Sequence, residues 1–167
     1  DDIWHISLEE VNLLSPAYQT SENGYGKNLK KPTVKTYKGT INNNAKTSVR
    51  LTLGKDFLDG YFKLKNDMFF IRSLNKILPD NKDPHQYIVF KSTDVINNPN
   101  ITSCGVINEN NMIEKGVEQI KNLAMASAST QCRFLEIATE ADFEYYQVNG
   151  SNAATTNNNI LSIMNQV

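Results

Sequence analysis

The residue with the most distinctive potential chemistry in this sequence is Cys104, in the polar stretch NITSCGVINENN (100–111). Structural cysteines usually lie among apolar residues, whereas this one precedes Gly105 in a segment that predicts a loop. The chain has one other cysteine, Cys132, so a Cys104–Cys132 disulfide is one interpretation. An idle thiol is another, and a thiol that meets a ligand outside this chain is a third.

Residues that bind metals or activate nucleophiles are otherwise scattered. The two histidines, His5 and His85, are far apart, and the sequence contains no His-x-x-x-His or Cys-x-x-Cys pair. It therefore predicts no self-contained zinc site. A Gly-rich phosphate loop and a G-x-S-x-G motif are also missing. We expect no catalytic residue and no bound cofactor in this chain.

The composition is that of an ordinary globular chain, and it excludes several classes of partner. The net charge is −1 over 167 residues and 40% of the residues are apolar. Nothing here favours binding to nucleic acid or to an anionic membrane. No apolar run approaches the roughly 20 residues that a membrane-spanning helix needs. The opening DDIWHI suits a mature or trimmed terminus and not a signal peptide.

Most of the first hundred residues alternate between apolar and polar side chains, which is typical of half-buried strands. The predicted strands are 3–8, 33–41, 47–54, 57–65, 68–74 and 86–92. Short turns separate most of them, which predicts consecutive hairpins in an antiparallel β-sandwich or barrel. The side chains that we expect inside this domain are Val49, Leu51, Leu53, Phe62, Leu64 and Phe70.

The pattern changes after Cys104. Residues 109–126 have helical spacing, and the small polar residues of 127–131 predict a linker. Beyond it the sequence predicts a strand over 132–142, a short helix over 142–150 that ends at Gly150, a polar loop from 152, and helical spacing again over 160–167. The expected class is mainly β, or α+β overall. The expected parts are a β-rich domain (1–106), a helix and linker (107–131) and an incomplete α/β fragment (132–167).

Two blocks of the sequence resemble a known family in the expected order. EIATEAD (136–142) followed by FEYYQ resembles the start of the catalytic domain in reprolysin-type (adamalysin, ADAM-like) zinc metallopeptidases. The stretch 37–71 resembles the matching propeptides, through Tyr37-x-Gly39, the Ser-x-Val-x-Leu-x-Leu run that begins at Ser48, and Gly60. Between them, SCGV (103–106) resembles the family's cysteine-switch motif, although the usual proline three residues before the cysteine is missing.

The resemblance implies a role for Cys104 with Gly105 and Val106. A catalytic zinc keeps one open position, and a thiolate that fills it at about 2.3 Å displaces the reactive water. A neighbouring glycine lets the backbone approach a cleft closely, and tethering raises the effective concentration of the thiol. The partner would be the chain's own catalytic domain, with zinc and calcium bound by the parent enzyme and neither by this chain.

Two further residues have a family interpretation and a structural one. The resemblance implies that Glu136 is a calcium ligand, whereas the sequence alone indicates an exposed strand residue. Asp142 precedes an apolar-periodic run, which favours a helix cap. We expect the aromatic residues that follow it, Phe143, Tyr145 and Tyr146, to lie in the core.

The resulting hypothesis is the latency and folding propeptide of a secreted zinc metalloendopeptidase, inactive as given because it lacks the zinc-binding helix. One alternative is a secreted β-sandwich adhesion or binding module without a peptidase connection. Another is a stand-alone inhibitor that acts in trans. If the strand over 133–139 lacks partners, its edge predicts pairing with the β domain, an edge-strand dimer or mobility.

Overall fold

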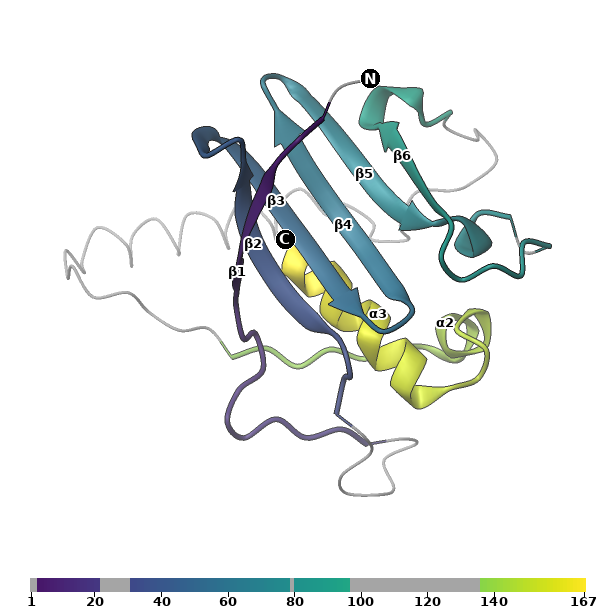
Figure 1. Ribbon diagram of the computed structural model, residues 1–167. Coiled ribbons are helices and arrows are strands. Elements are labelled where there is room, and N and C mark those ends of the chain that lie inside the picture. Colours follow the sequence, from purple (N-terminus) through teal and green to yellow (C-terminus); the bar gives the residue numbers. More distant parts are fainter. Residues whose placement is uncertain (1–2, 22–30, 79, 97–135) are drawn as a thin grey trace, which may run out of the picture. The chain divides into compact units, whose positions relative to one another are not determined.

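The computed structural model describes residues 3–21, 31–78, 80–96 and 136–167. In this part of the chain, six strands form one antiparallel sheet in sequence order (Figure 1). They are β1 (Ile6–Glu10), β2 (Lys35–Ile41), β3 (Asn44–Gly54), β4 (Phe57–Leu64), β5 (Asp67–Ser73) and β6 (Tyr87–Lys91). The mainly β class is confirmed. The sheet is open, with β1 and β6 at its edges, and is not the expected sandwich or barrel, because a helix and not a second sheet packs on it.

The chain divides into two compact units. One unit joins residues 1–95 to residues 138–167, and the other comprises residues 96–137. The predicted helix over 109–126 and the predicted boundaries at 106 and 131 lie outside the described residues, so they stay predictions.

Tight turns explain why the strands follow one another in register. The β2–β3 turn consists of Asn42 and Asn43, whose φ angles of 50° and 54° are in the left-handed region that asparagine tolerates. The β4–β5 turn uses Lys65 with φ 57°. A 3-10 helix, η1 (Leu74–Lys76), follows β5, and a second one, η2 (Ser92–Asp94), follows β6.

The apolar face of the sheet carries the core, as the alternation predicts. Val49, Leu51 and Phe62 are buried there together with Ile41. Other side chains pack partly buried against this cluster: Trp4, Leu53, Leu58, Leu64, Phe69 and Ile71. The rings of Phe62 and Phe69 stack at 5.0 Å, and Trp4 meets Phe62 edge-on at 5.1 Å.

One core prediction is wrong in its face. Phe70 pairs with Tyr61 in the register, one residue out of phase with the Phe62–Phe69 pair, so its side chain lies on the opposite side of the sheet. It lies 5.7 Å from the ring of Phe90 and is only partly buried. Phe69, the neighbouring aromatic residue, occupies the core position instead.

Two glycines, one in β2 and one in β4, allow close approach of neighbouring strands. A Cβ added at Gly39 would lie 2.1 Å from the carbonyl oxygen of Ser7 in β1. A Cβ added at Gly60, where φ is +151°, would lie 2.0 Å from the carbonyl oxygen of Arg50 in β3. The backbone therefore requires glycine at both positions.

The C-terminal segment is helical where the structure describes it. Helix α2 (Phe143–Val148) matches the predicted short helix, and Gly150 follows it with φ +73°. Helix α3 (Ala153–Gln166) begins earlier than predicted, so the polar loop predicted before residue 160 is wrong. The strand predicted over 132–142 is also wrong in its described part, because residues 136–142 are irregular and mostly exposed. No strand of the described segments pairs with residues 136–142, and strand formation depends on packing against cross-strand neighbours.

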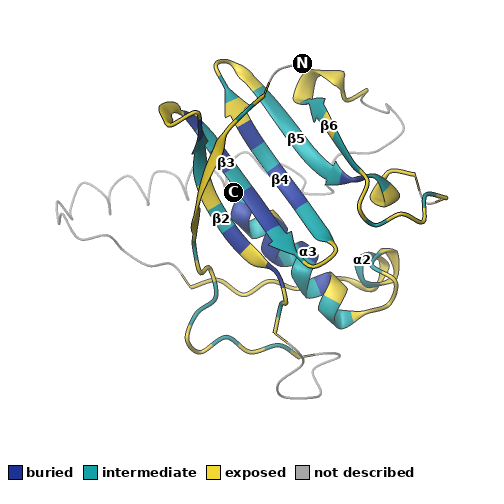
Figure 2. Cartoon of the chain, in the orientation of Figure 1, coloured by how far each residue is buried: buried dark blue, intermediate teal, exposed yellow. Residues whose placement is uncertain are grey.

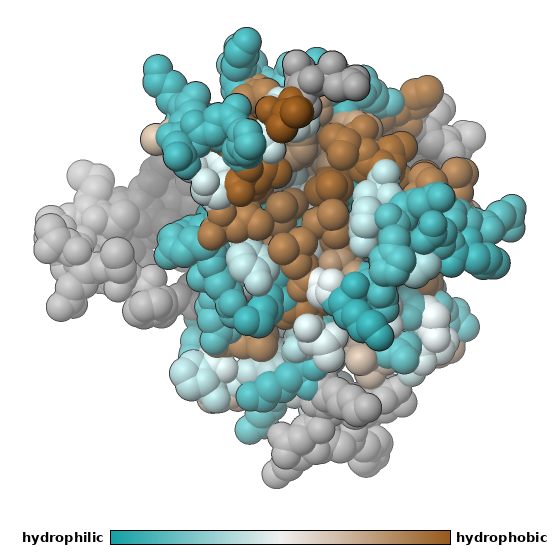
Figure 3. Space-filling model, viewed as in Figure 1, coloured by the Kyte–Doolittle hydropathy of each residue, from teal (hydrophilic) through white to brown (hydrophobic). Residues whose placement is uncertain are grey.

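Helix α3 covers the side of the sheet opposite the apolar face (Figure 1). Figure 2 shows the buried positions concentrated in β2, β3 and β4 and along α3. Figure 3 shows hydrophobic side chains gathered at the centre of the other face. Among the described residues, no helix is long and apolar enough to span a membrane.

Candidate functional site at the seam between helix α3 and the sheet

The predicted cysteine switch lies outside the described residues. This holds for Cys104, Gly105 and Val106, and also for Cys132. The zinc-ligand interpretation and the disulfide interpretation therefore both stay predictions.

The structure describes the two other predicted residues. Glu136 is exposed in an irregular segment, and its role as a calcium ligand stays a prediction. Asp142 caps helix α2, since its carboxylate accepts a hydrogen bond of 2.7 Å from the backbone N–H of Tyr145. The cap interpretation is confirmed. Phe143 is 66% exposed, so its predicted place in the core is wrong.

The histidines and acids of the described segments do not form a metal site. No group of three His, Cys, Asp or Glu side chains gathers within residues 3–21, 31–78, 80–96 and 136–167. His85 lies in a turn, with Nε2 3.9 Å from the carboxylate of Asp56.

A buried carboxylate between helix α3 and the sheet is the most unusual chemical group in the described chain. Asp59 in β4 is 4% exposed. Its Oδ2 accepts a hydrogen bond of 3.0 Å from Ser162 Oγ in α3. Arg72 Nη1 lies 3.5 Å from its Oδ1, and Lys76 Nζ lies 3.9 Å from its Oδ2. Buried charges are stable only when partners compensate them, and here two cations and one hydroxyl do so.

Helix α3 presents a polar stripe to this side of the sheet. Every third residue along the stripe is buried: Thr156, Asn159, Ser162 and Asn165. Asn165 donates hydrogen bonds to the carbonyl oxygen of Leu51 at 3.0 Å and to Thr52 Oγ1 at 3.3 Å. A longer contact of 3.4 Å reaches the carbonyl oxygen of Tyr37. We call this stripe and the sheet groups that it contacts the α3 seam.

The seam continues towards η1 and helix α2. Lys76 Nζ donates a hydrogen bond of 2.6 Å to Asn159 Oδ1. Asn159 in turn donates to Asn149, whose own amide donates to the carbonyl oxygen of Tyr145. At the start of the helix, Asn158 exchanges two hydrogen bonds with Thr33, of 2.9 and 3.1 Å. The stripe is thus fixed by specific partners along most of its length.

Burial shifts the pKa of two groups at or beside the seam. Desolvation lowers the pKa of Lys76 below its ordinary value of 10.5, opposed by Asp59, while Arg72 lowers it further. Desolvation also raises the pKa of Tyr145 above its ordinary value of 10.0.

Sequence analysis missed the α3 seam. The run Asn157–Asn159 indicates a turn, because asparagine has low helix propensity. A weaker signal was present: Asn152 at the N-cap, whose side chain accepts from Thr155 N–H at 3.0 Å, and small polar residues at every third position from 156. Hydrogen bonds to the sheet outweigh the intrinsic propensity of these residues.

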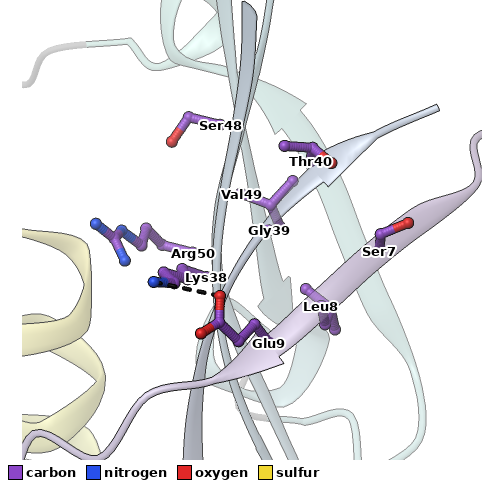
Figure 4. Close-up of a pocket in the computed structure, with 9 residues that line it drawn as sticks. All are labelled: Ser7, Leu8, Glu9, Lys38, Gly39, Thr40, Ser48, Val49 and Arg50. Carbon is purple, nitrogen blue, oxygen red and sulfur yellow. Dashed lines mark ion pairs between the residues drawn. The ribbon is translucent and has the colours of Figure 1, made fainter. Parts of the chain in front are cut away.

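A shallow hollow of about 440 Å³ adjoins β1, β2 and β3 (Figure 4). Ser48, Lys38 and Arg50 point to one side of the strands, and Val49 to the other. Lys38 Nζ lies 3.2 Å from the carboxylate of Glu9. Because its lining lies on both sides of the sheet, the hollow is not one enclosed site, and we assign no function to it.

Comparisons with family models, with curated proteins and with solved structures each return no match for this chain.

Proposed function

We propose that residues 1–106 are the latency and folding propeptide of a secreted zinc metalloendopeptidase whose catalytic domain begins near residue 132. In this proposal Cys104 is the thiolate that blocks the catalytic zinc, flanked by Gly105 and Val106. The zinc would polarise and deprotonate water in the mature enzyme. The chain's own residues supply the inhibitor and not the catalytic groups.

The observation that supports this proposal most is where α3 binds. The propeptide-like stretch and the catalytic-domain-like segment are far apart in the sequence, yet Asn165 reaches the backbone of Tyr37 and Leu51 in that stretch. Ser162 and Asp59 are 103 residues apart and share a hydrogen bond. A propeptide that assists the folding of its enzyme must contact it in this manner. The stretch that resembles the propeptides also contains Gly39 and Gly60, and at both positions an added Cβ would clash with the neighbouring backbone.

The test uses the reading frame that encodes this chain. We expect a His-Glu-x-x-His motif about 100 to 150 residues downstream, because two histidines one helical turn apart and a glutamate form the zinc-binding helix that the proposed enzyme needs. In the protein extended through that motif, Cys104→Ala should release peptidase activity before processing, because water regains the fourth zinc position. Cys132→Ala is the matched control and should leave latency intact.

Two results would contradict the proposal. One is a reading frame without such a motif. The other is quantitative bonding of Cys104 to Cys132 in the secreted protein, measured by thiol titration and mass spectrometry, because that bond consumes the ligand. A synthetic peptide over residues 102–108 gives an independent readout, since it should inhibit the mature enzyme weakly and its Cys→Ser form should not.

A second candidate is a secreted binding module, and the apolar face favours it. Val89 in the edge strand β6 is 47% exposed, and Leu8 in the other edge strand β1 is 38% exposed. Exposed edges and apolar side chains of this kind can bind another strand or another protein. This candidate gains support if the reading frame lacks the zinc motif while the chain binds a partner through β6.

A further inference from the structure

Helix α3 packs on the polar side of the sheet and not on its apolar face. The row of sheet residues beneath it is Thr36, Thr52 and Asp59, which pair across β2, β3 and β4. All three are at most 4% exposed. Amphipathic helices usually bury an apolar stripe against a sheet. Here the buried stripe is mostly polar, so the interface is specified by hydrogen bonds.

Three polar residues of the stripe each meet a different element of the sheet unit. Asn159 binds Lys76 in η1. Ser162, one turn later, binds Asp59 in β4. Asn165, another turn later, binds Leu51 and Thr52 in β3. A helix shifted by one residue or inverted would lose all three sets, so the sheet recognises this helix in one register.

The Asp59 carboxylate accepts a hydrogen bond at Oδ2 but faces only a cation at Oδ1. Within the described residues Asp59 Oδ1 has no hydrogen-bond partner, and its nearest cation, Arg72, is 3.5 Å away. Arg72 and Lys76 are 38% and 33% exposed, so water competes for both cations. If helix α3 dissociated, water would again solvate the Asp59 carboxylate, and much of the free energy that its burial costs would be recovered.

We propose that the α3 seam is a zinc-independent grip of the propeptide on helix α3 of its enzyme, so that cutting the connecting chain does not by itself release the propeptide. The partner that this sheet surface fits is a helix with small polar residues at every third position. The inference rests on the proposed function for the identity of the partner, whereas the grip itself is a property of this chain.

The test cuts the full chain between its two halves. A recognition sequence for a site-specific protease is inserted after Ser127, in the predicted polar linker, and the cut protein is passed over a size-exclusion column at micromolar concentration. The column runs under reducing conditions, so that a Cys104–Cys132 disulfide cannot join the fragments, and we expect the fragments to elute together. Asn165→Asp keeps the shape of the side chain but replaces its N–H donors with a carboxylate beside carbonyl oxygens, and it should weaken the association at least tenfold. Ser162→Leu, which places bulk against Asp59, should do the same.

Controls separate loss of the grip from loss of the fold. Ile163→Ser changes a side chain that is 50% exposed on the same helix and should leave the fragments associated. The fluorescence of Trp4, the single tryptophan, reports the apolar face and should be unchanged in all three variants.

Separation of the unsubstituted fragments on cutting would overturn the inference, as would equal retention of the Asn165→Asp and Ser162→Leu fragments. Neither outcome bears on Cys104. If the fragments separate while Cys104→Ala activates the extended protein, latency by the cysteine stands alone. If they stay together in a protein without a zinc motif, the grip stands and the proposed function fails.

Discussion

Different kinds of interaction stabilise the two sides of the sheet. On the apolar face, stacked and edge-on rings join Trp4, Phe62 and Phe69, and the stabilisation comes from apolar area removed from water. On the other side, the α3 seam joins Asp59, Ser162 and Asn165 through directional hydrogen bonds. The apolar side gains its stability from the area that its side chains bury. The seam joins distant segments and depends on individual atoms.

This difference indicates which contacts are permanent and which are conditional. Hydrophobic burial scales with area and does not depend on orientation, so it holds the sheet together under most conditions. Net gains from single hydrogen bonds are about 1 kcal/mol, because water competes for the same groups. A helix bound mainly by such contacts is stable as a whole but can be released by one well-placed change.

The largest effect should come from Gly60, where strands β3 and β4 approach each other closely. Gly60→Ala places a Cβ 2.0 Å from the carbonyl oxygen of Arg50 and so separates β3 from β4. We expect a loss of about 4 kcal/mol or more in the free energy of unfolding, measured by urea denaturation. Gly150→Ala is the control. The φ of Gly150 is also positive, +73°, but a Cβ added there would meet no atom within 4 Å, so the free energy of unfolding should fall by only about 1 to 2 kcal/mol.

The apolar side is tested next. Phe62 is 4% exposed between Trp4 and Phe69, so Phe62→Ala should lower the free energy of unfolding by about 3 to 5 kcal/mol through a cavity. Trp4 fluorescence should change in the same variant, because its edge-on partner is gone. Phe62→Leu retains most of the volume and should cost clearly less. Equal losses for the two variants would show that this ring is not a core contact.

The seam should respond less, but specifically. Ser162→Ala removes the hydroxyl that donates to Asp59 Oδ2, and we expect a loss of about 1 to 3 kcal/mol. Ile163→Ala, on the exposed side of the same helix, should change stability by less than about 0.5 kcal/mol. Denaturation should show the Ser162→Ala loss with Trp4 fluorescence of the native state unaltered. A Ser162→Ala protein as stable as the parent would contradict the seam.

The smallest effect is a pH dependence at Lys76. Its pKa is below 10.5 in the folded chain, so as the pH approaches 10.5 the unfolded chain holds more protons than the folded chain. The free energy of unfolding due to this group should therefore rise with pH in that window. Tyr145 acts oppositely: its contribution is present below pH 10.0 and is lost as the pH rises through its raised folded-state pKa. Comparison of Lys76→Met with the parent from about pH 8.5 to about pH 10 should show a flatter slope in the variant. Lys63→Met, at an exposed position, should keep the parent's slope.

Sequence patterns identified the sheet well because its determinants are local. Strand β3 alternates around Val49 and Leu51, and Asn42 and Asn43 supply the turn before it. The face of Phe70 was wrong because two adjacent aromatic residues fit either phase of an alternating pattern.

The seam could not be predicted in the same way. Asp59 has the sequence environment of any surface carboxylate, and the residues that bury it are 103 positions away. The helix that contains Asn159 forms against its own propensity, because partners elsewhere in the fold satisfy its side chains. The role of Cys104 stays a prediction, because this residue lies outside the described segments.

The order of the strands also has a consequence for the speed and sequence of folding. Each strand pairs with the next along the chain, and β2 to β5 are joined by tight turns, so most of the sheet closes short loops. The hydrogen bonds of α3 to the sheet and to η1 span 83 to 128 residues, and each doubling of a loop costs about 0.6 kcal/mol more in closure entropy. The sheet should therefore form first and capture α3 last, which makes it a template that is complete before the segment that follows it has found its structure.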